Sequence, residues 1–409
     1  MRKTKVGALA AVALFAFAAC SAGGGGTASK GEIEIWSSLP RQGSSKAQTD
    51  TIVNAINMAI EEKGGVAGGY KIVFKDVDDS TAAAGKWDEA TEIKNANDAV
   101  ANDKVMAYIG TFNSGAAKLS IPILCQKGIP MVSPANTYPG LTKAGKGEPN
   151  EPDVYYPGGC ARNYSRVVAA DDLQGLAGAK WAAKLGAKNV YVLDDTELYG
   201  KGIADVFNDE AAGAGLTVLG RDGIDGKATD YKALAEKIKA TTPDLVYYGG
   251  ITQNNAGKLW VDLRDAMPDV LLMGPDGILE QEWIEAAGAA AEGTYITFGG
   301  LPASELTGKG AEFVKNYNAK YPNNPPEAYT AYGYEAASVV LAAIERAAAT
   351  NPADNAALRA AVLKEIMGTK DFAGALGTWS FNAEGDTSLT AMSGNIVKDG
   401  KFAFDSVIE

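Results

Sequence analysis

The chain of 409 residues contains no histidine. Without this residue, a Ser–His or Cys–His nucleophile pair cannot form, and most zinc and iron sites lose their commonest ligand. There are only three cysteines, and no two of them form a CxxC pair, which excludes a cysteine-based metal knuckle. The sequence therefore predicts neither a cofactor nor a bound metal.

The chain is also short of proline and of positive charge. With 16 prolines and a hydrophobic content of 46%, its composition is typical of a globular protein rather than a disordered one. The 38 Lys and Arg residues face 50 Asp and Glu residues, which leaves a net charge of -12. This balance argues against nucleic acid or an anionic membrane surface as a partner.

Long hydrophobic runs are absent except at the start of the chain. Arg2, Lys3 and Lys5 precede an apolar run over residues 6–19. The run is about 14 residues long, against the roughly 20 that a membrane-spanning helix needs. Residues 1–20 are therefore predicted to be a secretory signal.

Cys20 follows Ala18 and Ala19 at the end of this run. A cysteine at the cleavage point resembles a bacterial lipobox, in which that cysteine becomes the lipidated first residue of the mature chain. The alternative is ordinary cleavage nearby, with Cys20 lost or unmodified. Residues 21–31 are rich in Gly and Ser and are predicted to be a flexible tether. We expect an extracytoplasmic protein, either in a periplasm or on the outer face of the cell membrane, that is held by a lipid on Cys20.

If Cys20 carries the lipid, Cys125 and Cys160 remain as an even pair in an oxidising compartment. Such a pair favours a disulfide. The alternative is two buried free thiols, because the sequence does not supply the distance between them.

The mature chain is too long for one ordinary core, so two domains are expected. Short β-rich runs alternate with helical patterns, pause at a Gly- and Pro-rich loop over residues 140–157, and then resume. The predicted strands are 32–39, 70–77, 105–110 and 129–133 before the loop, and 190–195, 216–220, 244–250, 270–274 and 294–300 after it. Strands linked by helices form right-handed βαβ units. Two such series predict an α/β fold of two doubly wound lobes.

Helical patterns at 313–321, 328–350 and 355–367, followed by short strands, form a tail that returns to complete both lobes.

Ligands of open α/β sheets bind beyond the carboxyl ends of strands. Three such places stand out: residues 109–115, residues 133–137 and residues 273–277. The first two offer helix-start N–H groups with the hydroxyls of Ser114 and Thr137, which suit a ligand carboxylate. The third offers Asp276 for an ammonium group. The alternatives are a plain helix cap at Ser114 and ordinary turn residues at Thr137 and Asp276.

An ordered set of motifs spans nearly the whole mature chain. They are INMAIEEKGGVAGGYKI, YIGTFNSGAA, IPMVSPANTYPGLT, ADDLQG, VLDDTELYG, DLVYYGG and GPDGI. In this order and spacing they resemble the branched-chain amino-acid binding proteins of the leucine/isoleucine/valine type. These are extracytoplasmic receptors of ABC importers with the type I periplasmic-binding-protein fold.

The resemblance implies two Rossmann-like lobes joined by three crossovers, here near Asp171, Gly299 and Thr378. One lobe would comprise residues 32–170 and 300–378, and the other residues 171–299 and 379–409. It also implies a monomer that closes on its ligand like a hinged clamp and then docks on an ABC permease.

The resemblance also implies the residues that bind the ligand. Ser114 matches the serine that holds the ligand carboxylate, and Ala135 and Thr137 match positions that bind the ammonium and carboxylate groups. Tyr199 and Asp276 match second-lobe residues, with Asp276 as the partner of the ammonium group. Phe112 beside the side-chain pocket and Gly277 after the acidic residue complete the predicted set.

Two departures from the family bear on which ligand is bound. Asp276 stands where glutamate is frequent, and Ile251 replaces a tyrosine that packs on the ligand. We therefore expect an aliphatic or branched-chain amino acid, or a related small amino acid or amide.

Three other functions compete with this one. A ligand-sensing receptor on the same fold would need an output segment that the sequence lacks. A sugar-binding protein would need exposed aromatic faces, for which Trp36, Trp181 and Trp260 are candidates if they are not core residues. A hydrolase using Asp194 and Asp195 is disfavoured, because neighbouring residues of a strand point to opposite faces.

Overall fold

The computed structural model describes Met1 and residues 30–408. The predicted signal over residues 1–20, the lipidation at Cys20 and most of the tether over 21–31 lie outside these described residues. Within the described part, no helix is both long and apolar enough to cross a membrane.

The first lobe is built on a six-stranded sheet with the order β2-β3-β1-β6-β7-β8. Its strands are parallel except for β2 at the edge. The strands are β1 (Glu32–Leu39), β2 (Val66–Ala67), β3 (Tyr70–Asp78), β6 (Val105–Gly110), β7 (Met131–Ser133) and β8 (Tyr164–Arg166). A small hairpin of β4 (Ser80–Thr81) and β5 (Lys86–Trp87) follows β3.

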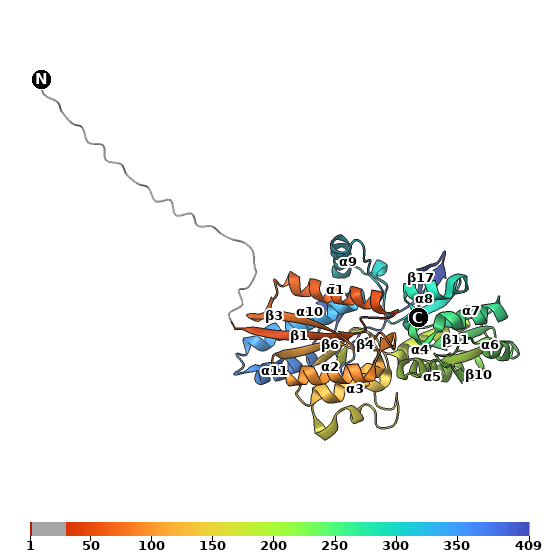
Figure 1. Ribbon diagram of the computed structural model, residues 1–409, viewed down its shortest axis with the longest axis horizontal. Helices are drawn as coiled ribbons and strands as arrows, with labels where there is room; N and C mark the ends of the chain where they lie inside the picture. The colour runs from red at the N-terminus through yellow and green to blue at the C-terminus, as the bar shows by residue number, and fades with distance from the viewer. Residues whose placement is uncertain (2–29, 409) are drawn as a thin grey trace.

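Helices cover both faces of this sheet (Figure 1). Because side chains alternate along a strand, Ile33 and Ile35 of β1 join the core under α1 (Lys46–Glu62), α10 (Thr330–Ala349) and α11 (Asn355–Met367). Trp36 points to the opposite face of the sheet and joins a second core, under α2 (Glu89–Ala101) and α3 (Ser114–Cys125). Asp88 caps α2 by accepting the Thr91 N–H at 2.9 Å.

The second lobe is built on a seven-stranded sheet with the order β10-β9-β11-β12-β13-β16-β17. The first five strands run parallel, and β16 and β17 add an antiparallel edge. The strands are β9 (Asn189–Asp194), β10 (Thr217–Gly223), β11 (Leu245–Gly249), β12 (Leu271–Gly274), β13 (Tyr295–Phe298), β16 (Met392–Lys398) and β17 (Lys401–Ile408). Its helices are α4 (Asp171–Lys184), α5 (Leu198–Ala211), α6 (Lys232–Lys239), α7 (Ala256–Ala266) and α8 (Gln281–Ala287).

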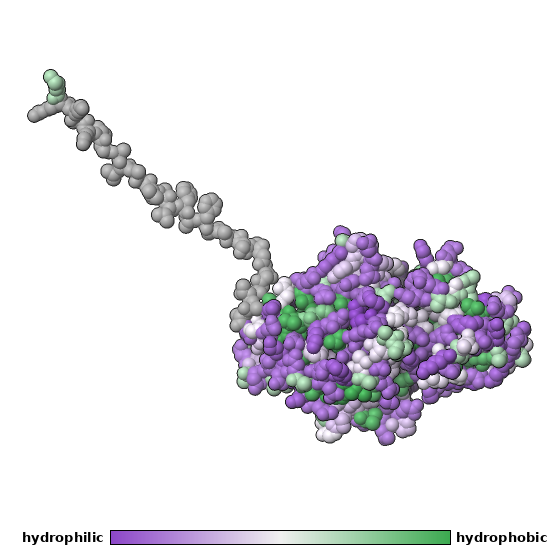
Figure 2. All heavy atoms as spheres, in the orientation of Figure 1, coloured by the Kyte–Doolittle hydropathy of each residue, from purple (hydrophilic) through white to green (hydrophobic). Residues whose placement is uncertain are grey.

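The predicted α/β fold with two helix-covered sheets is confirmed. The two lobes lie side by side, with the late helices α10 and α11 returning to the first lobe (Figure 1). The helices α4 and α8 were not predicted from periodicity. Figure 2 shows that the displayed face is mostly hydrophilic, because the helices turn their apolar sides to the core and their charged sides outward.

The chain passes between the sheets after β8, after β13 and before β16. The third passage comes later than the predicted crossover near Thr378. β15 (Gly377–Trp379) pairs with β14 (Phe372–Gly374), and Asp386 still bridges to Arg166 of β8. The predicted boundary at 378/379 is therefore too early, because an ion pair with a distant residue keeps the segment as far as Asp386 on the first lobe.

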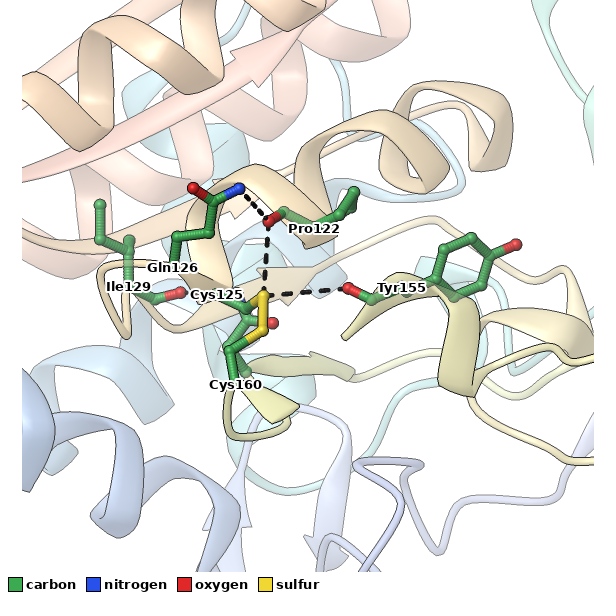
Figure 3. The surroundings of a disulfide bond; sticks show 7 residues. Pro122, Cys125, Gln126, Ile129, Tyr155 and Cys160 are labelled. Carbon is green, nitrogen blue, oxygen red and sulfur yellow. Dashed lines mark hydrogen bonds between the residues drawn. A yellow bond between two sulfur atoms is a disulfide. The ribbon is translucent and has the colours of Figure 1, made fainter. Parts of the chain in front are cut away.

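The loop between β7 and β8 is tied to the end of α3 by a disulfide. Cys125 is the last residue of α3 and bonds Cys160, with 5.8 Å between the two Cα atoms. The carbonyl oxygens of Pro122 and Tyr155 lie 3.4 and 3.9 Å from the Cys125 sulfur (Figure 3). The segment closed by the bond contains β7 and η1 (Pro139–Leu141). After η1 it contains only the short 3-10 turns η2 (Asp153–Tyr155) and η3 (Pro157–Gly159).

We expect the Cys125–Cys160 bond in the exported protein. Alkylation without reductant should label neither thiol, and reduction should lower the free energy of unfolding by about 2–4 kcal/mol because the unfolded chain loses a constraint. Mass spectrometry of the alkylated protein checks the bond, and denaturant unfolding with and without reductant checks its effect. Labelling of both thiols in the native oxidised protein would rule the bond out.

Candidate ligand site between the two lobes

A small cavity lies where the carboxyl ends of strands from both sheets meet. Its walls come from the residues that follow β6, β7, β11 and β12, from the start of α5, and from the segment before α10. Six of the seven predicted binding residues line it; Thr137 does not. The lining is Phe112, Asn113, Ser114, Ala135, Tyr199, Ile251, Asp276, Gly277 and Tyr329. Carboxyl strand ends are where open α/β sheets bind ligands.

The first lobe supplies the start of a helix. Ser114 is the first residue of α3 and is buried, and Asn113 rather than Ser114 occupies the N-cap position. The Ser114 hydroxyl accepts the Tyr138 N–H at 3.3 Å. The positive end of the α3 dipole and this hydroxyl therefore meet at the cavity, which suits an anionic group.

The loop after β7 is shaped by Ser133, whose hydroxyl accepts the N–H groups of Ala135 and Asn136 at 3.1 and 2.8 Å. This turn places Ala135 on the cavity wall. Thr137 lies two residues further, buried, and its hydroxyl has no hydrogen-bond partner among residues 30–408. Its carbonyl accepts the N–H of Asp171, so it sits beside the start of α4.

The second lobe supplies a buried carboxylate at Asp276. Its Oδ1 accepts from Gln174 at 2.7 Å and from the Tyr199 hydroxyl at 2.9 Å, and its Oδ2 accepts from the Tyr329 hydroxyl. Burial raises the pKa of the Asp276 carboxyl above its ordinary value, although these three donors oppose the rise. A carboxylate has about four acceptor positions, so one remains for an ammonium group.

Gly277 allows the close approach of Tyr199. The Gly277 N–H donates to the Tyr199 hydroxyl at 3.0 Å. A Cβ atom at position 277 would lie 2.4 Å from the Gly250 carbonyl oxygen and 2.7 Å from the Tyr199 ring. Only glycine fits here without displacing the backbone or this ring.

Three wall or supporting residues were not predicted. Asn113 lies between two predicted residues, and Gln174 lies in the motif ADDLQG, where it had no assigned role. Tyr329 comes from the first lobe and packs edge-on against Phe112 at 5.7 Å between ring centroids. It lies just before α10, in a stretch whose pattern indicated only a core helix, so the sequence held no signal for its role.

The residues proposed for other functions are engaged elsewhere. Trp36, Trp181 and Trp260 are at most 2% exposed and belong to the lobe cores, so they offer no face to a sugar. Asp194 pairs with Arg221 at 3.0 Å, and Asp195 accepts from Asn254 at 2.8 Å.

The two lobes contact each other directly around the cavity. Besides the Tyr329–Asp276 bond, the β4–β5 hairpin reaches across: Lys86 pairs with Glu197, and the Trp87 indole donates to the same carboxylate at 3.1 Å. On another side, the Ser45 hydroxyl donates to Glu280 at 2.6 Å. The cavity is therefore enclosed by groups that separate if the lobes move apart.

Comparison with known proteins identifies the family. The periplasmic binding protein family matches residues 32–400. The chain belongs to this family. Its members are substrate-binding proteins rather than enzymes, and they act outside the cytoplasm.

Individual relatives cover almost the whole chain. This binding protein is 30% identical to the Leu/Ile/Val-binding protein BraC3 of Rhizobium johnstonii over 371 residues, which are 90% of this chain and 91% of the relative. It is 30% identical to the Leu/Ile/Val-binding protein homolog 3 of Brucella melitensis over 92% of this chain and 94% of that one.

Solved structures show the same fold. A leucine binding protein of Thermotoga maritima superposes with a TM-score of 0.79 at 28% identity, covering 92% of this chain and 99% of that one. The substrate binding protein LivJ of Streptococcus pneumoniae, solved with isoleucine, superposes with a TM-score of 0.76 at 24% identity and the same coverage.

If Ser114 holds a ligand carboxylate, Ser114→Ala should weaken binding by about 1.5–3 kcal/mol, the usual scale for a hydrogen bond to a charged group. Calorimetry with the amino acid that stabilises the protein most measures the loss. Ser406→Ala, on the edge strand β17 of the second lobe and outside the cavity lining, is the control and should bind as wild type does. An unchanged affinity in Ser114→Ala would remove this residue from the site.

Proposed function

We propose that this protein is the extracytoplasmic substrate-binding component of an ABC importer. It takes up an aliphatic or branched-chain amino acid, or a related small amino acid or amide, between its two lobes. The observation that carries the proposal is the cavity in which the α3 start of one lobe faces the Asp276 carboxylate of the other. The relatives named for leucine, isoleucine and valine support the class of ligand.

The two ends of the cavity suit the two charges of an amino acid. The carboxylate lies against the Ser114 hydroxyl and the α3 start, with Ala135 beside it. The Thr137 hydroxyl, which is buried without a partner among the described residues and lies outside the cavity lining, joins these contacts when the wall residues move. The ammonium lies against Asp276, with Tyr199 and Gly277 next to it. A positive group here favours the ionised carboxylate and so opposes the effect of burial on the Asp276 pKa.

The shape of the pocket bears on which ligand is bound. Ile251 and Phe112 form its apolar wall, and Ile251 is buried. The cavity measures about 20 Å³, which is room for about one water molecule. An amino acid therefore enters only when the lobes separate or the wall residues move, and the lobes then close on it.

A ligand screen followed by solution scattering tests this function. At 100 times its dissociation constant, a bound ligand should add about 2.7 kcal/mol of stability, which a thermal-shift screen of amino acids and simple amides detects. Since the ligand contacts both lobes, it stabilises the closed form, and the radius of gyration should fall when it is added.

Asp276→Asn is the control for this experiment, because it keeps the shape but loses the charge that faces the ammonium. It should show neither the thermal shift nor the compaction at the same ligand concentration. A tight ligand that leaves the scattering unchanged would contradict the clamp. A ligand recovered chemically altered would contradict a binding protein altogether.

We also propose that a lipid on Cys20 anchors the protein to a membrane. The support is the short apolar run that ends in a cysteine after two alanines. Cys20→Ser should move the protein from the membrane fraction to the soluble fraction of the source cells, whereas Ser21→Ala should not. Retention of Cys20→Ser in the membrane fraction would contradict the anchor.

A further inference from the structure

Arg166 is a fully buried cation at the end of β8. Its side chain is 0% exposed, and its ion-pair partner Asp386 is 8% exposed. The Nε atom donates to Asp386 Oδ1 at 2.7 Å, and the Thr142 hydroxyl donates to the same oxygen at 2.9 Å. Burial by itself would raise the pKa of the Asp386 carboxyl, but the Arg166 charge holds it below its ordinary value. Both groups are thus charged inside the first lobe.

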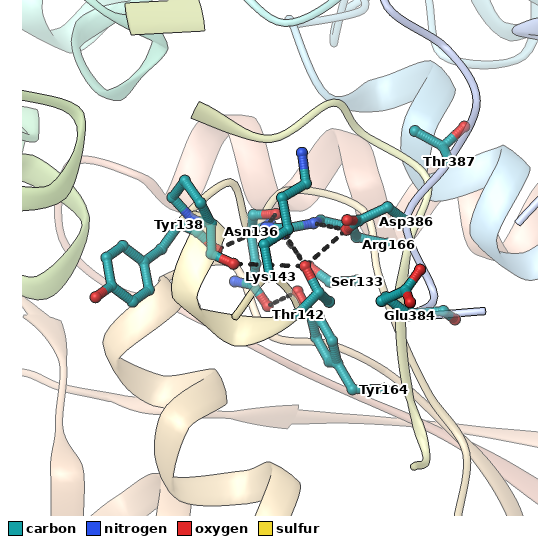
Figure 4. Close-up of polar contacts among 12 residues, drawn as sticks. Ser133, Asn136, Tyr138, Thr142, Lys143, Tyr164, Arg166, Glu384, Asp386 and Thr387 are labelled. Carbon is teal, nitrogen blue, oxygen red and sulfur yellow. Dashed lines mark hydrogen bonds and ion pairs between the residues drawn. The ribbon is translucent and has the colours of Figure 1, made fainter. Parts of the chain in front are cut away.

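The rest of the guanidinium binds the loop that carries Ala135 and Thr137. One terminal nitrogen donates to the carbonyl of Asn136 at 3.3 Å and to that of Tyr138 at 2.8 Å, on either side of Thr137. The other donates to the Thr142 hydroxyl. Figure 4 shows these groups converging on the guanidinium from the loop and from the segment around Asp386.

The same ion pair lies at the start of two of the three linkers between the lobes. Four residues separate Arg166 from α4, where the second lobe begins. Five residues separate Asp386 from β16, so that linker spans at most about 18 Å. The Arg166 N–H also donates to the Gly385 carbonyl at 3.0 Å, which adds a backbone tie between the two linkers.

We infer that Arg166 and Asp386 are positioning residues that hold the 135–138 loop in its ligand-binding shape and join it to the ends of two linkers. The identity of the ligand in this inference rests on the proposed function. The contacts of Arg166 with the loop and the linkers do not depend on that proposal. Arg166 is placed outside the cavity wall, so it acts through the loop carbonyls and not on the ligand. Loosening it moves Ala135 and Thr137 and the linker ends together, which reduces affinity without removing a ligand contact.

Arg359 provides a matched control at the other end of the first lobe. It is also buried, and it also donates to backbone carbonyls, those of Val105 and Asp103, both at 2.8 Å. A lysine cannot reproduce the several directed bonds of a guanidinium, so Arg166→Lys and Arg359→Lys should both reduce stability. Only the first should affect the loop at the cavity.

The experiment compares these variants by hydrogen exchange and by calorimetry at a temperature where each is folded. In the ligand-free protein, Arg166→Lys should speed exchange of the amides in residues 135–142 by at least about tenfold, since a broken tie lowers the local opening energy. It should also weaken binding of L-isoleucine, or of whichever amino acid binds wild type most tightly, by about tenfold. Arg359→Lys should leave both unchanged.

Asp386→Asn keeps the shape of the side chain and should likewise speed amide exchange in residues 135–142 and weaken ligand binding. It replaces Arg166→Lys in the experiment if that variant does not fold. Equal effects of Arg166→Lys and Arg359→Lys, or unchanged exchange in residues 135–142, would overturn the inference. If wild type binds no amino acid or amide, the proposed function fails, and the exchange comparison alone decides the role of Arg166.

Discussion

The structure depends most on the burial of the Asp276 carboxylate at the junction of the two lobes. A buried charge is costly unless donors surround it. Gln174 and Tyr199 of the second lobe and Tyr329 of the first supply three donors. Since one donor comes from the opposite lobe, the environment of the carboxylate is complete only when the lobes meet. Ionisation of this group, contact between the lobes and binding of a cationic group are therefore physically linked.

The fold brings these groups together because both sheets direct their carboxyl strand ends to the same cleft. Close approach across this cleft needs small residues on the second lobe. A Cβ atom at Gly202 of α5 would lie 2.6 Å from the ring of Tyr138, which belongs to the first lobe. The aromatic ring thus rests on a helix surface that glycine leaves open. The disulfide at Cys125 restrains the long loop that follows this tyrosine on the same lobe.

The proposed closing movement of the lobes requires a firm attachment on each side. The Arg166–Asp386 pair supplies one on the first lobe, because it joins the loop at residues 135–138 to the ends of two linkers. A ligand shifts the balance between open and closed forms only by its differential affinity for them. Contacts such as Ser45–Glu280 and Lys86–Glu197 join the two lobes and lie outside the cavity lining. Under the proposed function, ligand affinity is thus divided between the cavity and the contacts that surround it.

Much of the fold and the location of the candidate site could be predicted from the sequence. Alternating strand and helix patterns determined the two sheets, because local hydrophobic periodicity reflects which face each element buries. The motifs around Ser114, Ala135, Tyr199 and Asp276 mark the strand ends that line the cavity. The helix α4 was not predicted, because its many small residues give only a weak hydrophobic periodicity.

Only the tertiary structure decided the contacts between residues far apart in the chain. Tyr329 lies 53 residues from the carboxylate to which it donates, and Asp386 lies 220 residues from Arg166. No local pattern marks such partners, because a single tyrosine or aspartate has the same sequence signature in a core, on a surface or in a site. The late third passage between the lobes follows from the second of these contacts. The sequence by itself therefore determined most of the elements and the strand ends that form the site, whereas long-range hydrogen bonds and ion pairs decided which side chains complete it.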